Sequence, residues 1–446
     1  MADVDLLIRG GQPADIAVEA GRIAAIGVEL ELSASSIFDA HGLEVLAGAV
    51  DAHVHFNDPG RADWEGWASG TAAAAAGGTT CVIDMPLNAS PPTVDAAGFR
   101  RKLAAASGVA RTDFALWGGL VPGKLGDLAA LAELGVVGFK AFMAPSGVDD
   151  FAAVDDLTLL EGMAEAARLG LPVAVHAESA AITEALAARA KGHGWRDYAA
   201  SRPLVAELEA ISRALLFAQE TGCALHVVHV SSGSGVRLVS GARARGVDVS
   251  CETCPHYLLL DEQDLERLGA VAKCAPPLRS RSDRDDLRSE LVAGAVDLLA
   301  SDHSPSPPEL KVGADAFAVW GGISGCQTLL PLALSEGLPL HLLSAAPARR
   351  FRLTDKGRLE VGADADLVIV ERGGRSELRA EQLLYRHRRS PFVGRQLRGR
   401  VVETFLRGWP ASAGAPRGAL VRPAPLREPA PAAQTGGSKR RDAPGG

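Results

Sequence analysis

The feature that most constrains the fold of this chain is a repeat of short apolar runs separated by longer amphipathic stretches. Runs rich in Val, Ile, Leu and Ala occupy residues 46–55, 80–84, 113–117, 136–142, 171–176, 224–230, 247–251 and 296–301. Helical patterns lie between them at 93–106, 156–169, 205–220 and 282–293. Strands that alternate with helices predict a parallel sheet. Eight such units over about 250 residues predict an α/β fold of the (β/α)8, TIM-like barrel type. An open doubly wound sheet is the competing interpretation, but no G-x-G-x-x-G follows the first run.

The two ends of the chain have a different sequence pattern from the middle. Residues 4–38 and 358–408 contain short alternating segments rich in Gly and Asp, which are typical of small β-sheets. The last residues are rich in Pro, Ala and Gly and cannot bury enough apolar surface to become ordered. We therefore expect a small β-sandwich domain built from residues 1–46 and 356–421, a barrel of residues 47–355, and a disordered tail of residues 422–446.

Composition excludes several classes of partner. The net charge of −8 argues against nucleic acid or an anionic membrane surface as a partner. No apolar stretch approaches the ~18 residues of a membrane-spanning helix, and the N-terminus lacks the pattern of a signal peptide, so a soluble cytoplasmic protein is expected. The six cysteines are scattered and predict no disulfide framework. Cys251 and Cys254 form a lone C-x-x-C, for which two core cysteines are favoured over a structural zinc site.

The first apolar run ends in an unusual segment, DAHVHFNDPGRADWEGW, at residues 51–67. In a strand, residues i and i+2 point to the same face, so His53 and His55 project together. They lie at the C-terminal end of the first barrel strand, which is the end where barrel enzymes hold their sites. One histidine there could be an ordinary core residue, but two on one face of an apolar strand favour metal ligands.

Polar residues also interrupt four later runs near their C-terminal ends. They are Lys140 in GFKAFM, His176 in VAVHAES, His226 and His229 in ALHVVHVSS, and Asp302 in LLASDHS. Each alone has a structural explanation, but the carboxyl ends of barrel strands meet at one rim. His226 and His229 are spaced by three and are expected to point to opposite faces. Because His229 lies nearer the strand end, we assign it to the metal and expect His226 to pack outward against a helix.

Lys140 does not fit a metal site as a protonated amine. An unpaired buried ammonium is costly, and it cannot bind a divalent cation. The deprotonated amine could instead add carbon dioxide, and the resulting carbamate is an anion with two oxygens that could bridge two metals. A salt bridge to Asp302 is the simpler alternative.

These residues together resemble the ligand set of the cyclic amidohydrolases, namely the dihydroorotases, hydantoinases and allantoinases of the amidohydrolase superfamily. The resemblance covers roughly residues 4–410, including VGADADLVIVE, which is similar to the small β domain of that superfamily. Within the group, several stretches resemble allantoinases. They include HFNDPGRADWEGW, GTAAAAAGGTTCVIDMPLN, YAASRPLVAELEAI, ETCPHYLLL, SDHSPSP and WGGISGCQ.

The resemblance implies an enzyme with two divalent metal ions. Histidine and carboxylate-type ligands favour zinc, and iron, cobalt or manganese could occupy the same ligand set. The implied ligands are His53, His55 and Asp302 for one ion, His176 and His229 for the other, and carboxylated Lys140 as the bridge. It also implies hydrolysis of a ring amide in which water attacks the carbonyl. Asp302 would take the proton of that water and pass it to the departing ring nitrogen, first as base and then as acid.

Allantoin, opened to allantoate, is the predicted substrate. Dihydroorotases meet the carboxylate of dihydroorotate with an arginine two residues after the second histidine, and an Arg fork is hard to replace. This chain has Asn57 there. It also has Ser306 where many members have Cys. The candidate substrate contacts are Asn57, Asn88, Ser146, Ala275 and Gly322, the last two through the backbone.

Three alternatives stay open from the sequence. The chain could be a hydantoinase (dihydropyrimidinase) or a dihydroorotase, which use the same ligand set on other rings. It could also be a non-catalytic scaffold of the same fold, although all six ligand positions are filled. The resemblance further suggests a homotetramer.

Overall fold

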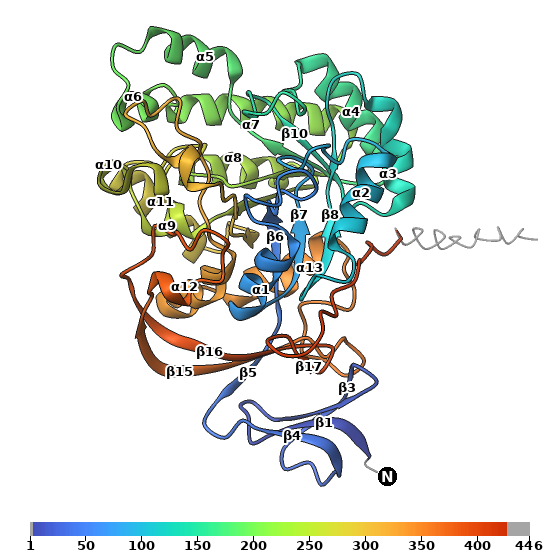
Figure 1. The fold of residues 1–446 in the computed structure, drawn as a ribbon. Helices are drawn as coiled ribbons and strands as arrows, with labels where there is room; N and C mark the ends of the chain where they lie inside the picture. Colours follow the sequence, from blue (N-terminus) through green and yellow to red (C-terminus); the bar gives the residue numbers. More distant parts are fainter. Residues whose placement is uncertain (1–2, 426–446) are drawn as a thin grey trace, which may run out of the picture.

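A parallel β-barrel forms the centre of the protein, as seen in a computed structural model that describes residues 3–425 (Figure 1). Its strands are β6 (Ala49–Val54), β7 (Thr79–Asp84), β8 (Asp113–Leu116), β9 (Gly118–Gly119), β10 (Phe139–Phe142), β11 (Val173–His176), β12 (Leu225–Val227), β13 (Val249–Thr253) and β14 (Leu298–Leu299). They run in the order β6-β7-β8 in one sheet and β9 to β14 in the other. Because β8 pairs with β7 and β9 pairs with β10, these two pieces share one position in the wall. Eight strand positions result, as the apolar runs predict.

The barrel closes between its last and first strands. Val54 forms a parallel bridge with His303, which follows β14. The backbone N–H of His55 donates to the carbonyl of His303 at 2.7 Å. A buried side chain adds a further link, since the Asp51 carboxylate accepts from the backbone N–H of Ser301 at 3.0 Å. These contacts exclude the open sheet and confirm the predicted barrel.

The two faces of the barrel wall pack into different apolar clusters. In β7, Cys81 and Ile83 belong to the inner cluster, which includes Phe351 after helix α13 (Ala345–Arg350). Val82, between them, belongs to the outer cluster under the surrounding helices. Both faces are therefore buried, which is why the strands are almost uniformly apolar. A polar side chain at a strand end is the exception that marks a site.

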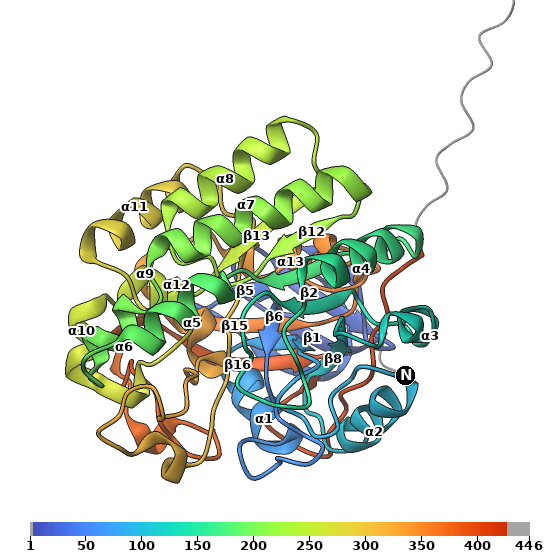
Figure 2. The ribbon, with the colours of Figure 1, turned by 90° about the horizontal axis from the view of Figure 1, so that it is seen from above.

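Helices surround the barrel (Figure 2). They are α1 (Trp67–Ala76), α2 (Ala96–Ala106), α3 (Leu128–Leu134), α4 (Asp156–Arg168), α5 (Ala180–Arg189), α6 (Trp195–Ala200), α7 (Leu204–Thr221), α8 (Gly233–Ala244), α9 (Pro255–Leu259), α10 (Glu262–Leu268), α11 (Arg281–Val292), α12 (Leu329–Glu336) and α13 (Ala345–Arg350). Helix α2 begins three residues later than predicted, because Asp95 caps it by accepting from the N–H of Gly98. The other predicted helices, α4, α7 and α11, agree to within one residue at each end.

Segments from both ends of the chain form two sheets below the barrel (Figure 1). One sheet has the order β3-β2-β1-β4 and the other β17-β16-β15-β5. Their strands are β1 (Val4–Arg9), β2 (Asp15–Glu19), β3 (Arg22–Gly27), β4 (Ala34–Asp39), β5 (Glu44–Ala47), β15 (Leu367–Glu377), β16 (Gln396–Leu406) and β17 (Trp409–Pro410). A shared cluster joins residues of both ends, such as Ile16, Leu367 and Phe405. This arrangement is the predicted β-sandwich of composite origin.

The last described residues run back along the barrel. Phe114 of β8 forms a parallel bridge with Leu420. Arg422 donates through Nε to the carbonyl of Leu134 at 3.1 Å, and the N–H of Ala424 donates to the carbonyl of Arg352 at 2.9 Å. The expectation that a disordered tail starts at residue 422 is therefore wrong for its first residues. The rest of that expectation, residues 426–446, lies outside the described residues.

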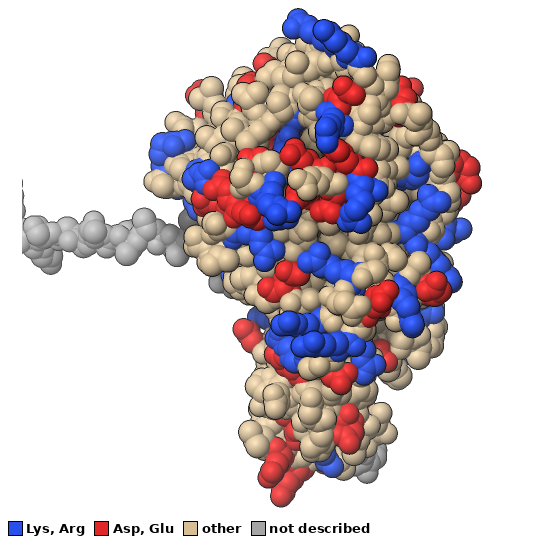
Figure 3. Space-filling view, turned by 90° about the vertical axis from the view of Figure 1, so that its left-hand side faces the viewer, with Lys and Arg blue, Asp and Glu red and all other residues tan. Residues whose placement is uncertain are grey.

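The visible surface mixes charges of both signs. On the face shown in Figure 3, acidic and basic side chains alternate over short distances. Ion pairs at the surface of the protein include Arg196 with Glu266 and Arg267 with Asp264. Among the described helices, none combines the length and the hydropathy that a membrane crossing requires.

Candidate functional site

A cavity of about 430 Å³ opens at the carboxyl ends of the barrel strands. Four histidines and an aspartate from four strand ends line it: His53 of β6 and His55 just after it, His176 of β11, His229 after β12, and Asp302 after β14. All five are buried. The volume suits a small molecule. The strand ends that the sequence marks therefore meet in one cavity.

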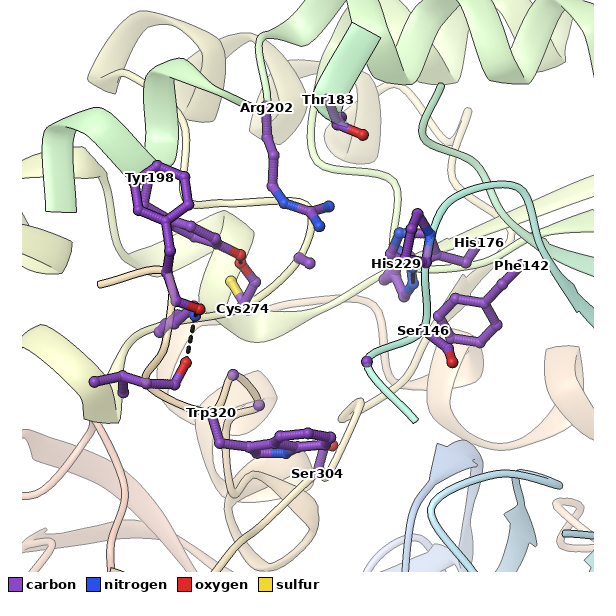
Figure 4. A pocket seen from close by; sticks show the side chains of 18 of the residues that line it. Phe142, Ser146, His176, Thr183, Tyr198, Arg202, His229, Cys274, Ser304 and Trp320 are labelled. Atoms are coloured by element: carbon purple, nitrogen blue, oxygen red, sulfur yellow. Dashed lines mark hydrogen bonds between the residues drawn. The ribbon is translucent and has the colours of Figure 1, made fainter. Parts of the chain in front are cut away.

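Within this cavity, two groups of ligand atoms converge on two places. In the first group, Oδ1 of Asp302 lies 3.2 Å from Nε2 of His53 and 3.5 Å from Nε2 of His55. This trio has the spacing of a metal site. In the second group, Nδ1 of His176 and Nε2 of His229 lie 3.0 Å apart, and Figure 4 shows the two rings together. Imidazole and carboxylate donors grouped in this way suit divalent metals such as zinc.

Lys140 of β10 is fully buried in the same region. Among the described residues, its Nζ finds no hydrogen-bond partner, and the salt bridge to Asp302 that the sequence left open is not formed. The Nζ atom lies 4.4 Å from the centroid of the Phe142 ring. Burial lowers the pKa of this amine to about 7. Much of Lys140 is therefore neutral near pH 7, and a neutral amine with no partner can react with carbon dioxide.

Two buried glutamates hold the histidines from behind, and the sequence analysis missed both. Glu252 Oε1 lies 2.5 Å from Nδ1 of His53. Glu178 Oε2 lies 2.8 Å from Nε2 of His176. Carboxylates in this position fix the tautomer and orientation of a metal-binding histidine. The available signal was an acidic residue at the end of an apolar strand: Glu252 follows the run 247–251 directly, and Glu178 lies two residues after His176.

His226 does not pack outward against a helix, so that expectation is wrong. Its ring faces the barrel interior, stacked on Trp117 at 6.5 Å and edge-on to Phe351 at 5.4 Å. Its Nε2 lies 3.1 Å from Oε2 of Glu252, so it supports the carboxylate that orients His53. The side chain of His229 also points into the cavity, because its φ of 41° breaks the alternation of side-chain directions just after β12. Both histidines can therefore face inward.

Left-handed backbone recurs around the cavity. Asn57, Asn88, His229 and Asp302 have φ values of 64°, 60°, 41° and 45°. For residues other than glycine, sparsely populated conformations cost about 1–3 kcal/mol each and gather at functional sites. Two of the four, His229 and Asp302, belong to the two groups of ligand atoms. The strained backbone at these two residues therefore goes together with the placement of their side chains in the cavity.

Replacing Glu252 by glutamine is expected to weaken metal binding by ~10–100-fold, the usual effect of losing such a supporting carboxylate. The isosteric amide removes the charge that holds His53 and His226. Metal content after dialysis against chelators of graded strength would measure the change. Asp113→Asn is a matched control, because this buried carboxylate in β8 pairs with Lys356 and not with a cavity histidine. Glu252→Gln with the metal retention of the unaltered protein would contradict the role.

A second cluster of carboxylates, outside the cavity, is neutralised by a lysine of the protein. Asp113, Asp364 and Asp366 have metal-like spacing. However, the Lys356 ammonium lies among them, 2.5 Å, 2.8 Å and 2.8 Å from their oxygens. This buried cluster joins the start of β8 to the sandwich. It is a structural ion-pair network.

Four of the five predicted substrate contacts line the cavity. They are Asn88, Ser146, Ala275 and Gly322. Asn57 does not belong to the lining: its side-chain amide is buried and donates to the carbonyl of Pro305 at 3.2 Å. Its left-handed φ of 64° turns the chain there, so Asn57 shapes the loop. Ser306 is also buried outside the lining.

Other lining residues were not predicted from the sequence. Figure 4 shows Thr183, Tyr198, Arg202, Cys274, Ser304 and Trp320 around the cavity. Several come from α5, α6 and the segment between β14 and α12, whose position over the barrel rim is a tertiary property. Tyr198, Arg202, Ser304 and Trp320 lie in the allantoinase-like stretches of the sequence, but those stretches did not assign them to the cavity.

The segment GRADWEG explains how one wall of the cavity is built. Arg61 donates through Nη1 to the carbonyl of Asn88 at 2.6 Å, and its guanidinium lies 5.5 Å from the centroid of the Trp64 ring. Trp64 in turn packs edge-on against Trp320, with ring centroids 5.0 Å apart. Asn88 and Trp320 both line the cavity. The segment therefore supports the wall from behind.

The chain is similar over nearly its whole length to characterised groups of enzymes. A model of the amidohydrolase family matches residues 45–410. An allantoinase of Rubrobacter xylanophilus is 57% identical, over 95% of this chain and 98% of that protein. An allantoinase of Solibacter usitatus is 52% identical, over 91% and 93%. Among solved structures, the L-hydantoinase (dihydropyrimidinase) of Arthrobacter aurescens has a TM-score of 0.91 at 36% identity, over 94% of this chain and 100% of that chain. The protein therefore belongs to the amidohydrolase family, as a cyclic amidohydrolase of the allantoinase group.

Proposed function

We propose that this protein hydrolyses the hydantoin ring of allantoin to give allantoate, with two divalent metal ions in the cavity. The observation that carries the proposal is the grouping of ligand atoms in two places, around Asp302 and around His176, in one cavity. The allantoinase relatives support the choice of substrate.

The donor set fits two cations. His53, His55 and Asp302 would hold one ion, His176 and His229 the other, and Lys140 would bridge them. Such ions, when bound, lower the pKa of water and polarise a carbonyl group. Glu252 and Glu178 keep the imidazoles of His53 and His176 oriented toward these places. Zinc is the proposed element on the basis of the ligand types.

Lys140 would contribute as a carbamate. The neutral amine forms a bond from Nζ to the carbon of carbon dioxide, and one proton leaves the nitrogen. The product is a carbamate anion with two oxygens, whereas the unmodified side chain in its protonated form is a cation. The absence of a protein partner for Nζ among the described residues and the lowered pKa of about 7 support this change.

Asp302 would move the proton of the reaction. Burial raises the pKa of its carboxyl, but the charge of His53 and the hydrogen bond from His55 outweigh burial and hold the pKa below its usual value. The carboxylate is therefore ionised and able to accept a proton from the attacking water. It then returns the proton to the ring nitrogen as the C–N bond breaks, because that nitrogen is a poor leaving group without it.

The choice of allantoin over related rings does not depend on Asn57. The side chain of Asn57 is engaged with Pro305 and lies outside the cavity lining, so it does not contact a substrate there. The lining includes aromatic, hydroxyl and guanidinium groups, such as Trp320, Ser304 and Arg202. This mixed polarity suits the ureido substituent of allantoin better than a large apolar substituent.

Steady-state hydrolysis of allantoin, dihydroorotate and a phenyl-substituted hydantoin tests the proposal. Allantoin is expected to give the highest kcat/KM. A higher value for either of the others would assign the protein to the hydantoinase or dihydroorotase alternative. Elemental analysis of the purified protein tests the scaffold alternative, for which near-zero divalent metal is expected. The cytoplasmic location and the homotetramer stay predictions from the sequence and its resemblance.

A further inference from the structure

We propose that Arg202 binds the ureido group of the substrate and is thereby a specificity-determining residue. This inference rests on the proposed function. Arg202 lies between α6 and α7, immediately before Pro203, the N-cap of α7. Figure 4 shows its guanidinium extending into the cavity, between Tyr198 on one side and the rings of His176 and His229 on the other.

The guanidinium of Arg202 is held in place by a buried carboxylate. Its Nη1 donates to Glu178, whose same oxygen lies 2.8 Å from Nε2 of His176. The Tyr198 ring flanks the guanidinium, with its centroid 5.8 Å away. Behind it, the carbonyl of Arg202 accepts from Nη1 of Arg279 at 2.6 Å. Because both the backbone and the head group are fixed, little entropy is lost when this side chain binds a ligand.

Within residues 3–425, Arg202 has N–H donors without a protein partner, whereas the donors of three other polar side chains that line the cavity are engaged with backbone carbonyls. The Tyr198 hydroxyl donates to the carbonyl of Cys274 at 2.9 Å. The Ser146 hydroxyl donates to the carbonyl of Phe151 at 2.6 Å. The Lys273 ammonium is directed at the carbonyls of Phe317 and Val319. A guanidinium has five N–H donors, and only Nη1 of Arg202 has a partner among the described residues.

The position of Arg202 fits a substituent of the ring better than the scissile bond. The Glu178 carboxylate and the imidazole of His176 separate the guanidinium from the convergent nitrogens. A group anchored at Arg202 would therefore lie to one side of the reacting carbonyl. In allantoin the ureido carbonyl is such a group, and it accepts hydrogen bonds well.

The pairing with Glu178 also favours a neutral ligand over an anion. Glu178 is fully buried, and its carboxylate already faces the positive charge of Arg202. The pair carries little net charge toward the cavity, so it gives weak electrostatic attraction for a carboxylate such as that of dihydroorotate. The free N–H donors still bind a carbonyl oxygen.

The alternative is that Arg202 acts only as a positioning residue, through Glu178 and His176. Unsubstituted hydantoin distinguishes the two, because it has the same ring and lacks the ureido group. In Arg202→Lys, which keeps the charge beside Glu178 but loses the fork, kcat/KM for allantoin is expected to fall ~10–100-fold, the effect of losing a charged hydrogen bond. The Ki of hydantoin as a competitor in the same assay is expected to change by less than about threefold, since it loses no such bond.

Controls make each result decisive. Arg196→Lys on α6, where Arg196 is exposed and paired with Glu266, should leave both constants unchanged. Arg202→Gln provides a second variant, with bound metal measured in each protein. Equal losses for allantoin and hydantoin, or an unchanged kcat/KM for allantoin, would overturn the inference. If the unaltered protein itself does not turn over allantoin, the proposed function fails instead.

Discussion

Replacing Asp302 by asparagine is expected to lower kcat for allantoin by ~10²–10⁴-fold, the usual contribution of a positioned acid–base group. The amide has nearly the same shape but cannot accept a proton from water or return one to the ring nitrogen. Its Oδ1 lies 3.2 Å from Nε2 of His53 and 3.5 Å from Nε2 of His55, at the place proposed for one metal ion and for the proton transfer. The loss should appear in kcat more than in KM, because the proton moves only during the reaction.

Steady-state kinetics together with bound-metal analysis measure this effect. The amide oxygen remains a weak ligand, so part of the metal at the His53 and His55 group should be retained. A comparison at equal metal occupancy then isolates the proton transfer. A variant within a few-fold of the unaltered enzyme at that occupancy would rule out Asp302 as the acid–base group.

Replacing Lys140 by alanine is expected to remove both the paired metals and the activity. The carbamate is the proposed bridging anion, and without it four imidazoles and one carboxylate must hold two cations with too little negative charge. The lysine is fully buried in β10, so its removal leaves a cavity in the barrel wall next to the site. Small carboxylates such as acetate can enter that space and supply the missing oxygens.

Partial rescue by acetate or propionate is therefore the specific result expected for Lys140→Ala. Lys140→Arg is the matched control: it keeps a long cationic side chain, forms no stable carbamate and leaves no space for the added acid. Elemental analysis and activity, each with and without the carboxylate, give the readout. An active Lys140→Ala protein with two bound metals would disprove the bridging role.

The barrel and the position of the main site could be read from the sequence because both depend on local pattern. Strands buried on both faces must be apolar, and eight such runs with helical spacers correspond to the eight positions seen. His53 and His55 could be paired because the side-chain period of a strand is two. The composite sandwich was predictable for the same reason, since both ends of the chain carry short alternating segments.

The prediction for His226 failed where backbone geometry departed from the ideal. Alternation placed His226 and His229 on opposite faces, but the positive φ of His229 brings both inward. Asn57 failed for a similar reason: its own left-handed turn commits the side chain to Pro305. Dihedral angles at loop junctions depend on contacts with distant strands. Those contacts cannot be inferred from a single sequence.

The sequence by itself determined the fold class and the set of ligand-type residues at the strand ends, because hydrophobic burial and side-chain period act over a few neighbouring residues. Only the tertiary structure decided which groups support that set. Glu252 comes to His53 from 199 positions away, and Arg202 comes to Glu178 from 24. These pairs form because barrel closure brings separate strands and loops to one rim. A buried charge there is stable only beside its partner, so the physical reason for each partner lies in the closed barrel.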